Sequence, residues 1–131
     1  MPGKDQVSHI YHITSLAAWE AARKAGEYRT PSLEREGFIH LSRRHQVLEV
    51  ANAFYEGDSG LVLLEVDTAL LKGDLRLELP AGLAPPEGSP PGERFPHLYG
   101  PLNLEAVVAV YDFSPDADGT FGLPPALRPE S

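Results

Sequence analysis

Apolar and polar residues alternate with a period of two in residues 37–42, the stretch around which the rest of the chain is organised. In a β-strand, this alternation directs Ile39 and Leu41 towards a core. His40 and Ser42 then share the opposite face, whereas a strand buried on both faces would carry apolar residues throughout. The pattern therefore predicts a short strand at the edge of the core or the wall of a cleft, with Ser42 capping the helix that follows.

The same patterns predict the other regular elements. Strands are expected at residues 7–13, 61–67, 75–79 and 104–113, and an extended segment at residues 95–100. Helices are expected at residues 15–25 and 43–56, where apolar residues recur at helical spacing and a glycine follows, with a single turn at 67–73. We therefore predict one α+β domain, residues 1–113, with two main helices.

Three segments lack such a pattern. Residues 27–36 are polar and contain Thr30-Pro31-Ser32, so the pattern predicts a loop or an irregular crossing. Residues 80–94 are rich in proline and glycine and are expected to form a mobile loop. From Ser114 onward, proline, glycine and aspartate dominate, so the tail at residues 114–131 is expected to be poorly ordered.

Two of the predicted elements indicate which side chains are buried. The second helix presents an apolar stripe made of Val47, Val50, Ala51 and Phe54. The strand at residues 75–79 has the most regular alternation in the chain, and its core face would be Leu75, Leu77 and Leu79. Arg76 and Glu78 then face away from the core together.

The composition narrows the class of protein. A chain of 131 residues buries about two thirds of its unfolded surface without a metal or disulfide. The absence of cysteine excludes thiol nucleophiles and zinc-thiolate sites, and it fits a reducing cytoplasm. No apolar run approaches the ~20 residues that span a bilayer. A net charge of −8 opposes binding of a long nucleic acid, but a small anionic ligand met by a few arginines is allowed. We expect a cytoplasmic protein without a membrane partner.

Candidate chemistry lies in four extended segments that each present two polar residues at a spacing of two. The pairs are His12/Thr14, His40/Ser42, Arg76/Glu78 and His97/Tyr99. Four such pairs in one small domain predict a shared polar cleft, in which His12, His40 and His97 converge within on the order of 10 Å. Arg43 lies in the first turn of the second predicted helix, where an anion is favoured. Tyr28 is expected to anchor the polar segment around it.

Several segments together resemble a known family: Ile10 to Thr14, Trp19, Gly26 to Tyr28, Gly37 to Ser42, Phe54 with Tyr55, and Phe95 to Gly100. They are similar to those of the bacterial domain-of-unknown-function 952 family. The resemblance covers residues 8–113, and the strings at residues 37–42 and 95–100 make it specific. That family is grouped by fold with the ADP-ribosyltransferase-like proteins.

The resemblance implies a split, twisted α+β fold with mixed or antiparallel sheets and a nicotinamide-dinucleotide cleft between them. It implies NAD as a substrate whose ADP-ribose is transferred or hydrolysed, with His12, His40 and Glu78 as catalytic residues. A carboxylate near the ribose would stabilise the developing oxocarbenium ion, and an aromatic wall would hold the nicotinamide ring. The expected ligand-binding residues are Thr14, Tyr28, Phe38, Ser42, Arg43, Arg76, His97 and Tyr99.

Other functions also fit the residues. His12-Ile-Thr14 and His40-Leu-Ser42 match the His-x-Thr/Ser signature of two-histidine phosphoesterases, in which one histidine is the base and the other the acid. A non-catalytic module that senses a nucleotide would use the same cleft. A zinc site at His12, His40 and His97 has no chelating spacing to support it, so no metal is expected. The oligomeric state stays open.

Overall fold

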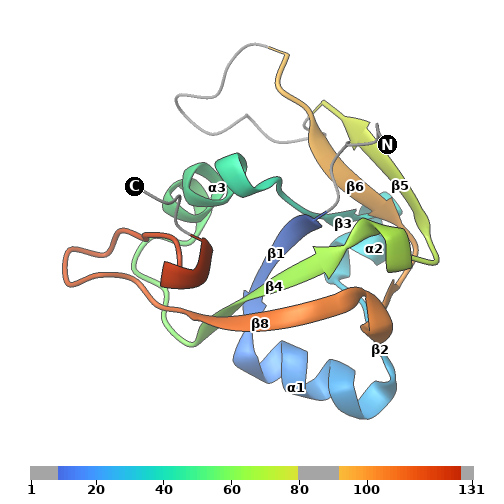
Figure 1. The fold of residues 1–131 in the computed structure, drawn as a ribbon, viewed down its shortest axis with the longest axis horizontal. Coiled ribbons are helices and arrows are strands. Elements are labelled where there is room, and N and C mark those ends of the chain that lie inside the picture. Colours follow the sequence, from blue (N-terminus) through green and yellow to red (C-terminus); the bar gives the residue numbers. More distant parts are fainter. Residues whose placement is uncertain (1–8, 80–91, 128–131) are drawn as a thin grey trace.

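The computed structural model describes residues 9–79 and 92–127, which form one α+β domain (Figure 1). Its helices are α1 (Leu16–Ala25), α2 (Pro31–Glu36) and α3 (Val47–Phe54), with single 3-10 turns elsewhere. Its strands are β1 (His9–Ser15), β2 (Glu27–Tyr28), β3 (Ile39–His40), β4 (Leu61–Asp67), β5 (Asp74–Glu78), β6 (Phe95–Tyr99), β7 (Leu102–Asn103) and β8 (Val107–Phe113). Every strand pair in these ranges is antiparallel, as the predicted fold class allows.

The strands form three small sheets. The order is β1-β4-β8 in the first sheet, β3-β6-β5 in the second and β2-β7 in the third. The apolar run at β4 is the central strand of the first sheet, and six of its seven residues are buried, which confirms the prediction for residues 61–67. No helix in the described ranges is long and apolar enough to cross a membrane.

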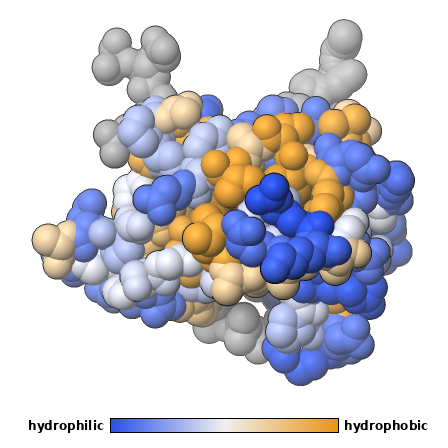
Figure 2. All heavy atoms as spheres, turned by 90° about the horizontal axis from the view of Figure 1, so that it is seen from below, coloured by the Kyte–Doolittle hydropathy of each residue, from blue (hydrophilic) through white to orange (hydrophobic). Residues whose placement is uncertain are grey.

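Two apolar clusters lie on the two faces of the β1-β4-β8 sheet. On one face, Trp19 and Ala22 of α1 pack with Ile10 and Leu64. On the other face, residues of α3 and of the C-terminal segment pack with β1, β4 and β8. Figure 2 shows the molecule from the side of α1 and β8, where apolar surface lies in the middle of the face among polar residues. The exposed large apolar residues of these two elements are Leu16, Val108 and Val110.

Helix α1 follows from local signals. Ser15 adopts an extended backbone, and its hydroxyl accepts a hydrogen bond from the Ala18 N–H at 3.0 Å, which satisfies one free donor of the first turn. Gly26 ends the helix in the left-handed conformation at φ 94°, where a side chain would be strained. The prediction for residues 15–25 is confirmed. Strand β1 extends to Ser15, two residues beyond its predicted end.

The chain crosses from one sheet to the other immediately after β3. The Leu41 N–H donates to the Pro96 carbonyl at 3.0 Å, and Tyr11 and Ser42 then exchange two backbone hydrogen bonds at 2.7 Å. Residues of β1 and β3 that are 28 positions apart are therefore brought together. Because Ser42 bridges to β1, it does not cap the next helix as predicted. A 3-10 turn with Arg43 at its cap comes first, and α3 begins at Val47.

The prediction of an irregular segment at residues 27–36 is wrong. Glu27 and Tyr28 form β2, which pairs with β7, and residues 31–36 form α2. The helix begins because the Thr30 hydroxyl accepts from the Leu33 N–H at 3.3 Å and Pro31 occupies the first turn. Proline therefore starts a helix here, where the sequence reading took it as a loop signal.

Two predicted apolar faces are only partly buried. Leu77 and Leu79 are 42% and 49% exposed because β5 is the outer strand of its sheet, and only Leu75 packs against a core cluster. In α3, Val47 and Ala51 are fully buried and Val50 is partly buried, whereas Phe54 is 49% exposed at the last helical residue.

The described part of the tail is folded, which corrects the expectation of little order. Phe121 and Leu127 are each 5% exposed and belong to the second apolar cluster. The Phe121 ring stacks on Phe113 with centroids 4.8 Å apart, and its backbone N–H donates to Asn52 Oδ1 at 2.8 Å. The segment therefore extends the core between β8 and α3. The loop predicted at residues 80–94 lies largely outside the described residues.

Candidate functional site

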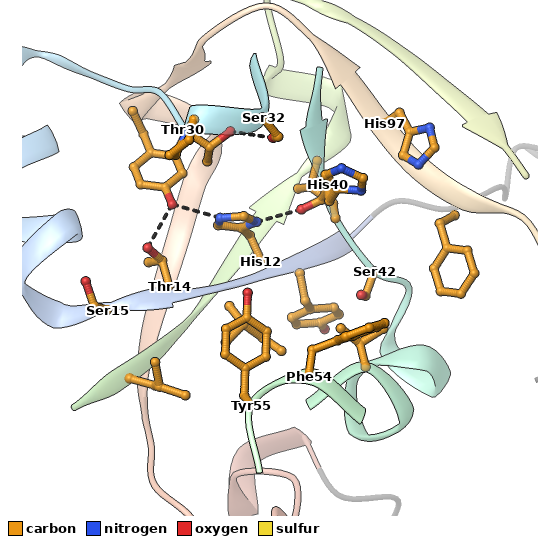
Figure 3. A pocket seen from close by; sticks show the side chains of 18 of the residues that line it. His12, Thr14, Ser15, Thr30, Ser32, His40, Ser42, Phe54, Tyr55 and His97 are labelled. Carbon is orange, nitrogen blue, oxygen red and sulfur yellow. Dashed lines mark hydrogen bonds between the residues drawn. The ribbon is translucent and has the colours of Figure 1, made fainter. Parts of the chain in front are cut away.

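A cavity of about 600 Å³ lies among β1, α2, β3 and α3 (Figure 3). Six of the predicted site residues line it: His12, Thr14, Tyr28, His40, Ser42 and His97. Side chains that the sequence analysis did not select complete its wall, chiefly Ser32, Arg35, Val50, Phe54, Tyr55 and Asp58. The cavity therefore has a polar side, from β1, β3 and β6, and a more apolar side, from α3 and the residues after it.

His12 is a buried polar residue of the cavity wall and is 8% exposed. Its Nδ1 lies 2.7 Å from the backbone oxygen of His40, and its Nε2 lies 2.8 Å from the Tyr28 hydroxyl. The same hydroxyl lies 2.8 Å from Thr14 Oγ1, and Figure 3 shows the three contacts as one chain. Tyr28 and Thr14 are themselves buried. Both ring nitrogens of His12 thus contact protein groups.

Burial sets the protonation state of this group. Removal from water lowers the pKa of His12 to about 4, so the imidazole is neutral near neutral pH. Because a carbonyl oxygen only accepts, the Nδ1–H donates to the His40 carbonyl, and the unprotonated Nε2 faces the Tyr28 hydroxyl, which donates to Thr14. Desolvation also raises the pKa of Tyr28. His12 therefore fixes the backbone of β3 and the hydroxyl of Tyr28 at the cavity wall.

His40 and His97 lie side by side on neighbouring strands. The register of β3 and β6 places them opposite each other, with ring centroids 5.3 Å apart. His40 Nε2 lies 2.7 Å from Glu36 Oε1, and His97 Nδ1 lies 2.9 Å from Glu78 Oε1. His97 is 1% exposed and stacks on Phe38 with centroids 4.1 Å apart, so burial lowers its pKa. Both histidines also line the cavity.

Glu78 does not face the cavity, which corrects the expectation that it shares a cleft with His12 and His40. It lies on β5, the outer strand, and β6 separates it from β3. Its carboxylate accepts hydrogen bonds from the Tyr99 hydroxyl at 2.7 Å and from His97, which lower its pKa. The Glu78 carboxylate is therefore connected to the cavity only through its hydrogen bond with His97, which lines the cavity.

The remaining predicted ligand-binding residues also lie outside the cavity. Tyr99 and Phe38 pack around His97, and the Arg76 guanidinium lies 4.5 Å from the Tyr99 ring centroid while it pairs with Asp74. Arg43 donates to the Arg94 carbonyl at 3.1 Å. The polar pairs of β3, β5 and β6 do share one face of their sheet, but the cavity reaches only the β3 and β6 part of it.

Arg35 lines the cavity, whereas Arg43 and Arg76, which the sequence predicted there, do not. It lies on α2 and is exposed, and it forms no ion pair within the described part of the chain. Asp58 is the one carboxylate among the described lining residues. Arg35 was not expected at the site because the polar pattern of residues 27–36 predicts an irregular segment; Thr30 and Pro31 were the available signals for a helix. Among the described residues, no group of three or more metal-ligating side chains is arranged to hold a metal ion.

The chain is similar in sequence and structure to known proteins. Residues 13–110 match the family described as "Protein of unknown function (DUF952)". The X-ray crystal structure of protein CC0527 from Caulobacter crescentus is similar, with 38% sequence identity and a TM-score of 0.77 over 92% of this chain and 98% of that chain. The solution NMR structure of CC0527 has 39% identity and a TM-score of 0.70, over 86% and 90% of the two chains. No curated protein matches the chain.

Proposed function

Because the chain belongs to the DUF952 family of proteins of unknown function, its activity has to follow from its own residues, and we propose that the cavity binds NAD or a related small nucleotide. The observation that supports this most strongly is the cavity itself. It combines a buried chain of polar groups with an aromatic wall and a guanidinium that forms no ion pair with any described residue, in a volume of about 600 Å³ that suits a nucleotide.

The aromatic wall suits a base or nicotinamide ring. Phe54 is 49% exposed although it is a large apolar residue, and it lines the cavity together with Tyr55 and Val50. An aromatic ring of a ligand packed there would remove this apolar surface from water. The polar side of the cavity, to which His40, Ser42 and His97 belong, would meet the hydroxyl groups of the sugar.

Arg35 suits the phosphate groups of the ligand. The chain as a whole carries a net charge of −8, so an anion approaches it favourably only where a positive group is exposed. Arg35 is such a group at the cavity, and a guanidinium binds phosphate oxygens in a two-pronged geometry.

Transfer or hydrolysis of ADP-ribose is the reaction that this ligand and the resemblance to ADP-ribosyltransferase-like proteins favour. Breaking the bond between nicotinamide and ribose develops positive charge at the sugar, which a nearby carboxylate stabilises. We assign that role to Asp58, which lines the cavity, and not to Glu78, which does not. A phosphoesterase mechanism needs two imidazoles that exchange protons with substrate, and both nitrogens of His12 are occupied by protein groups.

The proposal predicts that replacing Arg35 by alanine weakens NAD binding. Losing a hydrogen bond to a charged group costs about 1.5–3 kcal/mol, so the Kd of Arg35→Ala for NAD should rise by about tenfold or more. The measurement is isothermal titration of wild type and Arg35→Ala with NAD. The matched control is Arg23→Ala, which removes the same charge from the surface of α1, where Arg23 pairs with Glu20. The proposal fails if wild type does not bind NAD at millimolar concentration, or if both variants lose the same affinity.

Turnover distinguishes an enzyme from a binding module. Release of nicotinamide from NAD is followed by chromatography for wild type and Asp58→Asn, which keeps the side-chain shape but removes its charge. A catalytic site predicts a rate that falls by about a hundredfold in the variant, because carboxylate stabilisation of the developing charge is lost. Wild type that binds NAD without releasing nicotinamide would instead identify a non-catalytic module.

A further inference from the structure

Two histidines at the cavity wall are each held by a glutamate from outside it. His40 contacts Glu36 through Nε2, and His97 contacts Glu78 through Nδ1. The two imidazole rings are 5.3 Å apart and nearly perpendicular, at 74°. Neither glutamate lines the cavity, whereas both histidines do. Glu78 was expected to act on the ligand directly, and Glu36 was not among the expected site residues.

The glutamates determine which nitrogen of each ring carries the proton. An ionised carboxylate only accepts hydrogen bonds, so the ring nitrogen that contacts it must carry the proton. In the neutral imidazole, the other nitrogen then has a free lone pair, at Nδ1 of His40 and Nε2 of His97. Burial lowers the pKa of His97, which favours this neutral state. Each ring therefore presents a hydrogen-bond acceptor on the side away from its glutamate.

The free nitrogen of each ring lies on the side away from its glutamate, and both histidines line the cavity. The two nitrogens of an imidazole point in nearly opposite directions, and the side of each ring that contacts a glutamate is outside the cavity. The His97 ring is locked by stacking on Phe38 at 4.1 Å, and Glu78 is locked by the Tyr99 hydroxyl. The pair is thus preorganised by residues that do not line the cavity.

We propose that His40 and His97 form a paired acceptor that recognises the two adjacent hydroxyl groups of a ribose in the cavity. Two hydrogen bonds of ordinary length from neighbouring hydroxyls span rings at this separation. This inference rests on the proposed nucleotide function and names the part of the ligand that the histidines bind. Glu78 and Glu36 are positioning residues, because they act through the histidines.

The experiment compares ligands that differ by one hydroxyl. Ribose 5-phosphate and 2-deoxyribose 5-phosphate are titrated into wild type beside NAD and 2′-deoxy-NAD, in each case by calorimetry. Loss of one hydroxyl leaves a buried acceptor unpaired, so we expect the deoxy compound of each pair to bind about tenfold more weakly. In the Glu78→Gln variant, the amide can either donate to or accept from His97 Nδ1, so this preference should fall to about twofold or less.

The matched control is Asp74→Asn, which removes a charge from the same strand at an exposed position that contacts Arg76. It should retain the full preference for the ribose compounds. A readout without ligand is the ¹⁵N chemical shift of the His97 ring, which reports the protonated nitrogen. Wild type and Asp74→Asn should show protonation at Nδ1, and Glu78→Gln should show a mixture.

The outcomes separate this inference from the proposed function. If NAD binds and its deoxy analogue binds equally well, the paired acceptor is wrong while nucleotide binding stands. If ribose 5-phosphate is preferred but NAD does not bind, the paired acceptor stands and the proposed function is wrong. If no compound binds, both are overturned. A His97 ring protonated at Nε2 in wild type would also overturn the paired acceptor.

Discussion

Replacing Phe121 by alanine is expected to lower the free energy of unfolding by about 3–5 kcal/mol, the usual cost of truncating a buried phenylalanine. Phe121 is 5% exposed, and its ring stacks on Phe113 in the cluster between β8 and α3. Alanine would leave a cavity next to Phe113 that the surrounding strands and helix can only partly fill. The measurement is urea unfolding followed by circular dichroism, at constant pH and protein concentration.

Phe54→Ala is the matched control, because it removes the same atoms from a position that is 49% exposed. Phe54→Ala should lower the free energy of unfolding by less than about 1 kcal/mol, since about half of the Phe54 side chain is already in contact with water in the folded protein. Equal losses in the two variants, or no loss in Phe121→Ala, would show that the segment after β8 does not belong to the core. The expected order of the two losses is the reverse of the order that the sequence pattern predicts, because the pattern buries Phe54 and leaves Phe121 in a poorly ordered tail.

The elements that the sequence predicts well are those whose signals are local. Helix α1 is bounded by a capping serine and a glycine, and both act on the backbone of their own segment. Strand β4 is a continuous apolar run, and such a run is favoured only where both faces are covered. No knowledge of distant residues is needed for either assignment.

The misassigned segments are those in which a weak local signal is decided by distant contacts. Phe121 stands in a stretch of proline, glycine and aspartate, and only its contacts with Phe113 and Asn52 order it. Helix α2 is six residues long and has no buried residue, so its sequence shows no apolar face. Its signals were the Thr30 cap and Pro31 at the first turn, which also occur in loops.

The candidate site shows the same division. The period of two correctly groups polar residues on one face of each strand, so that residues of β3, β5 and β6 share a face. The order of the strands in the sheet is not encoded in that period. Because β5 is outermost, Glu78 reaches the cavity only through His97. His12 is buried and its ring bonds to protein groups, because the crossing at Ser42 brings the His40 carbonyl within hydrogen-bond distance of Nδ1.

The buried His12 makes the stability of the domain depend on pH. Its pKa is about 4 in the folded protein, well below the ordinary value of 6.5, because burial disfavours the charged ring. Between these values the unfolded chain binds a proton that the folded chain does not. The stabilisation is therefore complete above the unfolded pKa and is lost as pH falls towards the folded pKa. His97, whose pKa is also lowered by burial, acts in the same direction.

We therefore expect the free energy of unfolding to fall by about 2 kcal/mol or more from about pH 7.5 to about pH 5, before most carboxylates titrate. His12→Gln is the informative variant, because its amide can donate to the His40 carbonyl as the imidazole does but does not titrate. Urea unfolding at several pH values should show a decline in the variant that is smaller by about 2 kcal/mol. Parallel pH dependence in both proteins would mean that folding does not lower the pKa of His12, and the neutral buried imidazole would then be wrong.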